Sequence, residues 1–197
     1  MISENKIDGL EMSIVEKIAE HYRAILELIG ENPERDGLKK TPMRAAKALA
    51  YLTSGYRKDY KKVLNSAIFE YAGSKMIIVR DIEFYSLCEH HILPFYGKVS
   101  IGYIPNGGMV GLSKIARLVE VFARRLQVQE RLTRELCDAL SEVLNASGVI
   151  VVCQADHLCM KMRGVEKESS FTQTIEYSGL FENFSYRQEF LTLLHDR

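Results

Sequence analysis

Apolar residues recur at helical spacing in the first quarter of the chain. Residues 10–29 place them every three or four positions, and Gly30 follows. A second such stretch opens at Thr41-Pro42 and runs through Leu52. This spacing gives a helix one apolar face, glycine is a usual stop signal, and proline is favoured in the first turn. The pattern predicts two helices, with Thr41 as the N-cap of the second.

Two further stretches in the second half of the chain have the same helical spacing. One begins at Ser113 and carries apolar residues to Leu126, and the other runs from about Gln129 to Leu144 before Gly148. A serine before an apolar-periodic stretch is a preferred N-cap. The pattern therefore predicts a pair of consecutive helices, the first of them capped by Ser113.

Short β-rich stretches lie on either side of this helix pair. Residues 76–84 and 98–105 read as two strands, and residues 149–157 and 171–177 read as two more. The Asn-Gly-Gly at 106–108 is a turn signal. Strands grouped around a helix pair favour an α+β fold with an antiparallel sheet, in the order ββααββ after the N-terminal helices.

The change from helical to strand periodicity suggests a boundary within the chain. We expect an N-terminal helical segment over residues 1–55 and a main domain over residues 56–197. A chain of 197 residues is long enough to bury a sizeable core.

Composition excludes several classes of function. Formal net charge is zero, so no general attraction to nucleic acid or to an anionic membrane is indicated. The longest apolar run, residues 148–153, is far too short to span a membrane. The N-terminal stretch MISENKIDGLEM has no apolar core of a signal peptide. With no export signal, the cytoplasm is the expected location, and metal binding or catalysis is the expected use of the cysteines.

Two cysteine-histidine pairs at short spacing suggest a metal site. Cys88-x-x-His91 is the first pair and His157-x-Cys159 is the second. Cysteine and histidine together suit a borderline-soft ion such as Zn²⁺. If residues 157–159 are extended, His157 and Cys159 point to the same side and could face one ion.

The spacing leaves the coordination of that ion open. Cys88, His91 and Cys159 would make a three-ligand site, as in catalytic zinc centres, with His90 and His157 free for proton transfer. Alternatively, His157 joins the three as the fourth ligand of a closed structural site. Both arrangements are compatible with the sequence.

Basic residues gather where the third helix begins. Ser113, Lys114 and Arg117 place a hydroxyl and two cations at a helix start, and Arg163 adds a cation near Cys159. Helix N-termini favour anions, so these residues could hold a polyphosphate. The alternative is a capped, solvated helix face.

Gln129 and Glu130 open the fourth helix and also have two interpretations. An acidic residue in a first helical turn is favourable by itself. A carboxylate at this position could also accept two hydrogen bonds from a guanine-like ring. Periodicity does not discriminate between the two.

Four longer motifs together resemble those of GTP cyclohydrolase I. They are SLCEHHILPFYGKVSIGYIP (86–105), GLSKIARLVE (111–120), RRLQVQERLT (124–133) and DHLCMKMRGVEKESSFTQT (156–174). The resemblance covers about residues 35–195. It implies the tunnelling fold (T-fold), a homodecamer of two stacked pentamers, and one Zn²⁺ per subunit. It also implies hydrolysis of GTP to 7,8-dihydroneopterin triphosphate and formate, the entry step to folate or tetrahydrobiopterin.

The resemblance assigns a role to each matching residue. It implies zinc ligands at Cys88, His91 and Cys159, with water in the fourth position, and an acid/base pair at His90 and His157. Guanine contacts are implied at Glu130 and Gln129. The implied triphosphate and ribose contacts are Ser113, Lys114, Arg117 and Arg163, with Arg44 supplied by a neighbouring subunit. Ser113 is also a candidate for assisting the rearrangement that follows ring opening.

Two rival classes stay open at the level of sequence. One is another tunnelling-fold enzyme, such as a 7-cyano-7-deazaguanine reductase, although these lack the Cys-x-x-His and His-x-Cys pairing. The other is a zinc-stabilised scaffold without catalysis. The sequence also leaves open whether a regulatory protein partner or an end product controls the activity, and which pterin pathway uses the product.

Overall fold

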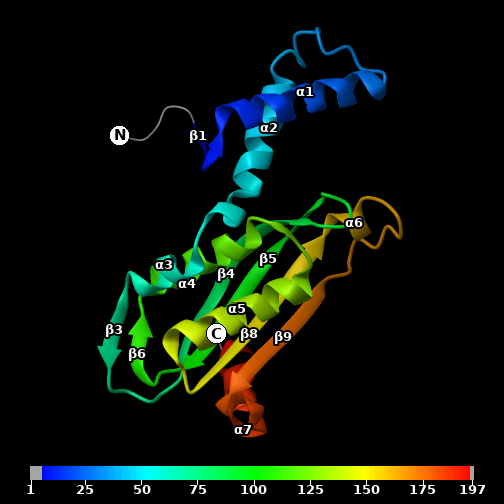
Figure 1. The fold of residues 1–197 in the computed structure, drawn as a ribbon. Coiled ribbons are helices and arrows are strands. Elements are labelled where there is room, and N and C mark those ends of the chain that lie inside the picture. Colours follow the sequence, from blue (N-terminus) through cyan, green and yellow to red (C-terminus); the bar gives the residue numbers. More distant parts are fainter. Residues whose placement is uncertain (1–5, 196–197) are drawn as a thin grey trace. The chain divides into compact units, whose positions relative to one another are not determined.

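The computed structural model describes residues 6–195, so the first five residues of the predicted N-terminal segment lie outside the described part. The chain divides into two compact units, of which the first ends at Arg57 and the second begins at Lys58 (Figure 1).

The first unit is mainly a pair of helices. Its elements are β1 (Lys6–Ile7), β2 (Leu10–Glu11), α1 (Met12–Leu28), α2 (Thr41–Leu52) and the short 3-10 helix η1 (Ser54–Arg57). Helix α1 begins later than predicted because Leu10 and Glu11 pair with Ile7 and Lys6 as a small antiparallel ladder. Thr41 is the first helical residue rather than the N-cap, which is Lys40.

Small side chains form the contact between these two helices. Val15 and Ala19 of α1 and Ala46 and Ala50 of α2 are buried together. Because alanine projects little from the helix surface, the two helices can pack closely while their polar faces stay in water.

The second unit has an α+β architecture built on a five-stranded sheet. Its elements are α3 (Tyr60–Asn65), β3 (Ile68–Tyr71), β4 (Ile77–Cys88), β5 (Pro94–Ile104), β6 (Gly107–Val110), α4 (Leu112–Ala123), β7 (Leu126–Gln127), α5 (Gln129–Leu144), β8 (Gly148–His157), α6 (Leu158–Lys161), β9 (Thr172–Gly179), the 3-10 helix η2 (Leu180–Glu182) and α7 (Phe184–His195). The strand order is β7-β4-β5-β8-β9, and every pair is antiparallel except β4 with β7.

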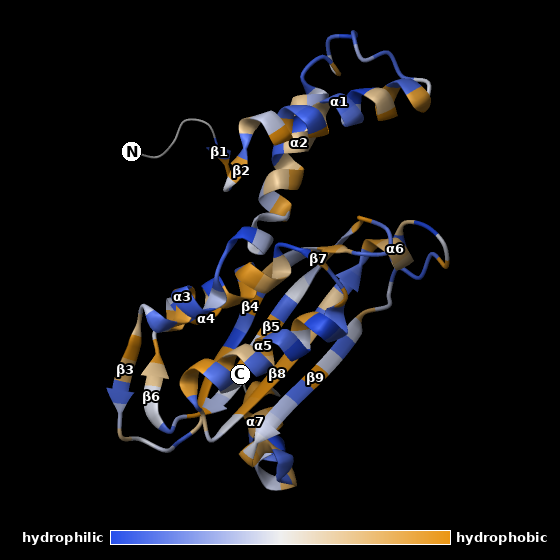
Figure 2. Cartoon of the chain, viewed as in Figure 1, coloured by the Kyte–Doolittle hydropathy of each residue, from blue (hydrophilic) through white to orange (hydrophobic). Residues whose placement is uncertain are grey.

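Strand β8 explains how the sheet is buried on both faces. Val149, Val151 and Cys153 belong to the large core that α4 and α5 form against the sheet. The alternate residues Ile150 and Val152 pack instead with Phe181 and Phe190 of the C-terminal segment. Successive side chains of a strand point to opposite faces, so an uninterrupted apolar run is needed where both faces are covered. The apolar run stands out along β8 in Figure 2.

The direction of the strands places two chain segments at one edge of the sheet. Both β4 and β8 are antiparallel to β5, so they run the same way and end at the same edge, at Cys88 and His157. Helix α4 runs toward this edge, because β7 directly after it pairs with the end of β4. Helix α5 then starts there at Gln129 and runs back.

Several local predictions need correction. The predicted turn at 106–108 is largely the start of β6, which pairs with β3. The cap of α4 is the backbone at Gly111, without a side-chain hydrogen bond, and Ser113 lies inside the helix. Strands β6 and β7 and helix α7 were not anticipated. Among residues 6–195, no helix combines the length and apolarity that a membrane crossing requires.

Candidate metal and catalytic site

A tight turn between β4 and β5 presents the first cysteine-histidine pair. The backbone N–H of Cys88 donates to the carbonyl of Leu93 at 2.8 Å, and the N–H of Ile92 donates to the carbonyl of Cys88 at 2.8 Å. Ile92 adopts a left-handed conformation with φ of 55°. These bonds close the turn, so the side chains of Cys88 and His91 leave it on the same side.

The second pair lies at a junction between a strand and a helix. His157 is the last residue of β8, and Cys159 lies in the first turn of the short helix α6. The condition that residues 157–159 are all extended is therefore not met at Cys159. Because the chain turns into helix α6 after His157, Cys159 does not continue along β8 but lies near Cys88 and His91.

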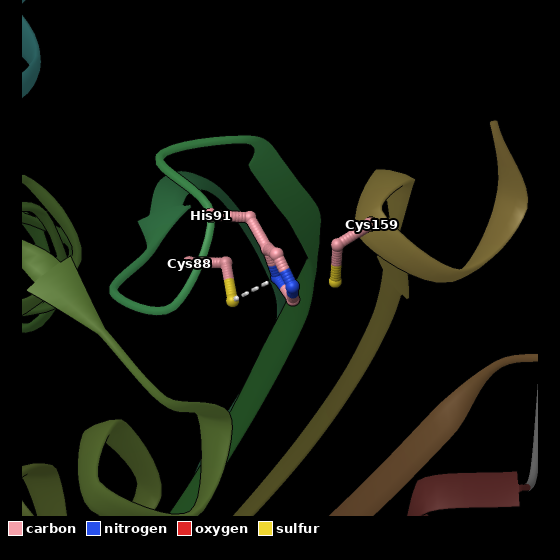
Figure 3. Close-up of side chains that lie close together, drawn as sticks. All are labelled: Cys88, His91 and Cys159. Carbon is pink, nitrogen blue, oxygen red and sulfur yellow. Dashed lines mark hydrogen bonds between the residues drawn. The ribbon is translucent and has the colours of Figure 1, made fainter. Parts of the chain in front are cut away.

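Cys88, His91 and Cys159 form a compact group of possible metal ligands. One ligand atom from each lies within 4.8 Å of the others, and Cys88 Sγ is 3.8 Å from His91 Nδ1 (Figure 3). Around a tetrahedral zinc ion with bond lengths near 2.3 Å to sulfur and 2.0 Å to nitrogen, the ligand atoms lie about 3.5–3.8 Å apart. The donor types and the spacing fit such an ion.

The structure distinguishes the two adjacent histidines. His90 Nδ1 is 3.9 Å from Cys88 Sγ, nearly as close as His91 Nδ1. Only His91, however, also comes within reach of Cys159. The two rings meet edge to face, at 81°, and the His90 side chain is 65% exposed. His90 therefore stands beside the ligand group in contact with solvent.

The two neighbouring thiols, Cys88 and Cys159, favour binding of a cation between them. Burial raises the pKa of the Cys159 thiol, and the neighbouring Cys88 raises it further, whereas the positive charge of Arg163 acts in the opposite direction. Two thiols this close cannot both ionise cheaply without a compensating charge. Binding of a metal ion would supply that charge and release the protons.

His157 is held on two sides next to this group. Its Nε2 lies 2.8 Å from Oε1 of Gln129, and its ring stacks on Phe95 with the centroids 4.7 Å apart. Burial lowers the pKa of His157, and the charges of Glu130 and Asp156 oppose that shift. Within the described residues, His157 is not part of the ligand group.

Arg131 was not anticipated from the sequence. It forms an ion pair with Glu89, donates from Nε to Gln127 Oε1 at 2.8 Å, and donates to the carbonyl of Leu126 at 3.1 Å. The side chain ties the turn after Cys88 to β7. The only hint in the sequence was Glu89, which lies next to the ligands and had no assigned role. Its partner Arg131 is 42 positions away, so local spacing could not reveal the pair.

The predicted substrate contacts do not all gather at this edge of the sheet. Glu130 is exposed in the first turn of α5, close to His157, and Arg163 is exposed near Cys159. Gln129 is buried and only 1% exposed. Arg44 belongs to helix α2 of the first unit.

Three other predicted contacts lie along helix α4. Ser113 and Lys114 are in its first turn and Arg117 is in its second, whereas the ligand group lies beyond its far end. From Ser113 to Ala123 the helix rises about 15 Å. In one chain, these residues are therefore separated from the ligand group.

Comparisons with known proteins agree with these observations. Residues 18–195 match the family described as GTP cyclohydrolase I. The chain is 52% identical to GTP cyclohydrolase 1 of Porphyromonas gingivalis over 92% of its length and 94% of the relative. It is 53% identical to GTP cyclohydrolase 1 of Bacteroides fragilis, covering 93% and 94%, and 54% identical to that of Campylobacter lari, covering 91% and 95%. A solved structure of an archaeosine synthase, QueF-Like, shares 16% identity over 53% of this chain with a TM-score of 0.40, too weak a likeness to bear on fold or function.

Proposed function

This chain belongs to the GTP cyclohydrolase I family, and on that premise we propose that it hydrolyses GTP to 7,8-dihydroneopterin triphosphate, with C8 released as formate. The observation that carries the proposal is the group of Cys88, His91 and Cys159 with His157 and His90 beside it. The reaction is the first step toward tetrahydrofolate or tetrahydrobiopterin.

One zinc ion per subunit is the proposed cofactor. Three protein ligands leave a tetrahedral ion with one open position, which is typical of catalytic rather than structural zinc sites. The open alternative is favoured because, among the described residues, His157 is not part of the group whose ligand atoms lie within 4.8 Å of one another. When bound, zinc supplies Lewis acidity and lowers the pKa of a water molecule.

The histidines are the proposed acid/base groups. His157 gives a proton to N7 of guanine as the five-membered ring of the guanine opens. His90, exposed beside the ligands, assists opening of the ribose by protonating its ring oxygen. Positioned acid/base groups of this kind contribute about 10²–10⁴-fold to a rate.

The substrate is held by residues of two kinds. Glu130 accepts hydrogen bonds from the guanine N1–H and the exocyclic amine. The sequence also predicts a guanine contact at Gln129, but the amide of this buried residue is already paired inside the protein. Ser113, Lys114, Arg117 and Arg163 contact the ribose and triphosphate, and Arg44 is supplied by a neighbouring subunit. Ser113 assists the rearrangement that precedes closure of the new ring.

The separation along α4 supports an assembly of several chains. Ser113, Lys114 and Arg117 are about 9–15 Å of helix away from the end of α4 at the edge that carries the zinc ligands. A triphosphate held by all of these residues would have to lie between two copies of the chain. This agrees with the predicted homodecamer of two pentamers with the tunnelling fold, in which residues 56–197 form the catalytic domain and residues 1–55 the helical segment.

The cytoplasm stays the predicted location. All four cysteines are free, and their burial or grouping suits packing and metal binding rather than a disulfide framework. GTP and further copies of the chain are the proposed partners.

A turnover assay tests the function. Zinc-loaded protein incubated with GTP should release formate and a product that oxidises to a fluorescent pterin, and a chelator should stop both. Zinc at one per chain without turnover would favour a scaffold. NADPH-dependent reduction of a nitrile substrate would favour the reductase class.

A mixing experiment tests the assembly. Lys114→Ala and His157→Ala chains should each be inactive alone. Co-assembled, they should regain activity, because some sites then receive Lys114 from a His157→Ala chain and His157 from a Lys114→Ala chain. Absence of recovery in verified mixed oligomers would place the whole site in one chain.

A further inference from the structure

Gln129 lies at the centre of a buried polar network. It is the first residue of α5 and only 1% exposed, and its side chain reaches the backbone of both β8 and β9. A buried amide must satisfy its two donors and its oxygen, so its neighbours decide how it is oriented.

Backbone carbonyls fix the orientation of this amide. Nε2 of Gln129 lies 3.1 Å from the carbonyl oxygen of Cys153 and 3.1 Å from that of Thr172. Carbonyl oxygens only accept hydrogen bonds, so the amide nitrogen must face them. The other end of the amide, Oε1, therefore faces His157, whose Nε2 is 2.8 Å away.

Two threonines reinforce this orientation. The hydroxyl of Thr133 donates to the carbonyl of Gln129 at 2.8 Å, which uses its proton. The hydroxyl of Thr174, 2.6 Å from that of Thr133, must then donate to it. Thr174 Oγ1 is left as an acceptor for Gln129 Nε2 at 3.2 Å. Each hydrogen bond in this network therefore has a fixed donor and a fixed acceptor. The amide of Gln129 cannot exchange the positions of its nitrogen and oxygen without losing these bonds.

We propose that Gln129 is a positioning residue that keeps Nε2 of His157 protonated, so that Nδ1 is the nitrogen that exchanges protons with the substrate. An amide oxygen can only accept, so the 2.8 Å contact requires a hydrogen on Nε2. The acid/base part of this inference rests on the proposed function, whereas the tautomer follows from the hydrogen bonds alone.

This arrangement suits a proton donor. When His157 carries two protons, Nδ1–H gives one to a substrate nitrogen and the ring becomes a neutral imidazole with its remaining proton on Nε2. The bond to Gln129 is the same before and after the transfer. The stack on Phe95, with ring planes 4° apart, holds the ring plane throughout. No rearrangement of the protein is then needed during the step.

The proposal differs from a direct contact between Gln129 and guanine. Both amide hydrogens and the amide oxygen already have partners inside the protein. If Gln129 mainly binds guanine, its loss should raise KM for GTP. If it positions His157, its loss should lower kcat and leave KM nearly unchanged.

Solid-state ¹⁵N NMR on the zinc-loaded, histidine-labelled protein tests the tautomer at any assembly size. The His157 signals are assigned by difference with His157→Gln. In the wild type, Nε2 should be the protonated nitrogen of neutral His157 and Nδ1 the unprotonated one. Finding the proton on Nδ1 would overturn the proposal, whether or not the protein turns over GTP.

Gln129→Met and Thr174→Val make a matched pair of variants. Both disturb the same network, and their effects on folding are compared by urea unfolding. Only Gln129→Met removes the acceptor for His157, so only this variant should show a mixture of tautomers and a fall in kcat of about 10²-fold. Thr174→Val removes one of the three acceptors of Nε2 and leaves both carbonyls, so the wild-type tautomer should remain and the fall in kcat should be much smaller than in Gln129→Met.

Every outcome bears on the proposal. Equal kcat losses in variants that are equally destabilised would show that Gln129 acts only through folding. A rise in KM for Gln129→Met with an unchanged tautomer would make it a guanine contact. Should Gln129→Met fail to fold, the wild-type spectrum still decides. Wild-type protein with the expected tautomer but no GTP turnover would refute the proposed function and leave the hydrogen-bond assignment standing.

Discussion

The ring of His157 lies parallel to the ring of Phe95, with centroids 4.7 Å apart and an angle of 4° between the ring planes. The two residues are direct partners in the β5–β8 ladder. Because Phe95 is fully buried, it offers a rigid surface against which the imidazole is held.

Phe95→Leu should lower kcat for GTP without loss of zinc, because the histidine ring loses its flat support. The free energy of unfolding should fall by about 1–2 kcal/mol, as for other changes of shape in a packed core. Phe84→Leu is the matched control: Phe84 is 1% exposed and packs edge-on against Phe95 at 5.8 Å, and it has no stacking contact with His157. A similar loss of kcat in both variants would contradict a special role for the stack.

Cys88→Ser and Cys159→Ser should each abolish stoichiometric zinc binding, because a hydroxyl is a much poorer zinc ligand than a thiolate. Elemental analysis after gel filtration in a weak chelator measures the metal content. Cys137→Ala is the control, since Cys137 is buried in the core away from the group. Full zinc content in Cys159→Ser would remove Cys159 from the ligand set.

Arg131→Met should weaken zinc binding by about 10–100-fold, the usual effect of losing a partner that orients metal ligands. The reason is that Arg131 ties Glu89, beside the ligands, to Gln127 and Leu126 of β7. Competition with a chromophoric chelator gives the affinity. Arg134→Met, an exposed position on the same helix, should leave it unchanged. Equal affinities in the two variants would show that the turn needs no such tie.

Glu130→Gln should raise KM for GTP by about 10–100-fold, because an amide nitrogen would then face the donors of guanine. Steady-state kinetics with GTP measure the change, and zinc content should stay at the wild-type level. Asp138→Asn, also exposed on α5, serves as the charge-matched control. An unchanged KM would remove Glu130 from guanine recognition.

Cys137 and Cys153 should resist thiol reagents at pH 8 until the protein unfolds. Burial raises the pKa of Cys137 to about 11 and that of Cys153 to about 12, so almost no reactive thiolate is present. Timed reaction with a chromogenic disulfide, with and without urea, counts the accessible thiols. Rapid labelling of either cysteine in the folded protein would contradict this.

The same two thiols also predict a dependence of stability on pH. Their pKa values are raised in the folded state above the unfolded value of 9.0. Their contribution to the free energy of unfolding is fully present below that value. It is lost as the pH rises from about 9 through the folded-state pKa values of about 11 and about 12, because the unfolded chain releases the protons first. Urea unfolding between pH 7 and pH 10 measures it, and Cys137→Ala should reduce the slope.

The long helices were predictable because each has a strong apolar period. Helix α2 has its predicted end at Leu52, and α5 spans Gln129–Leu144 as predicted. Helix α7 has no comparable apolar period, because only a few of its residues, such as Phe190 and Leu194, pack on the sheet. Strand β6 could not be foreseen, since its glycines form a strand only by pairing with β3.

By itself, the sequence determined which chemical groups are available: the thiols, imidazoles and carboxylates, and their spacing within each motif. The tertiary structure alone decided which of them meet. Cys159 lies within reach of His91 and not of His90, and Arg131 pairs with Glu89, which is 42 positions away in the sequence. Gln129 reaches His157 across 28 positions. The reason is physical, because a hydrogen bond or a metal site needs atoms within a few ångströms, and strand direction and packing set those distances.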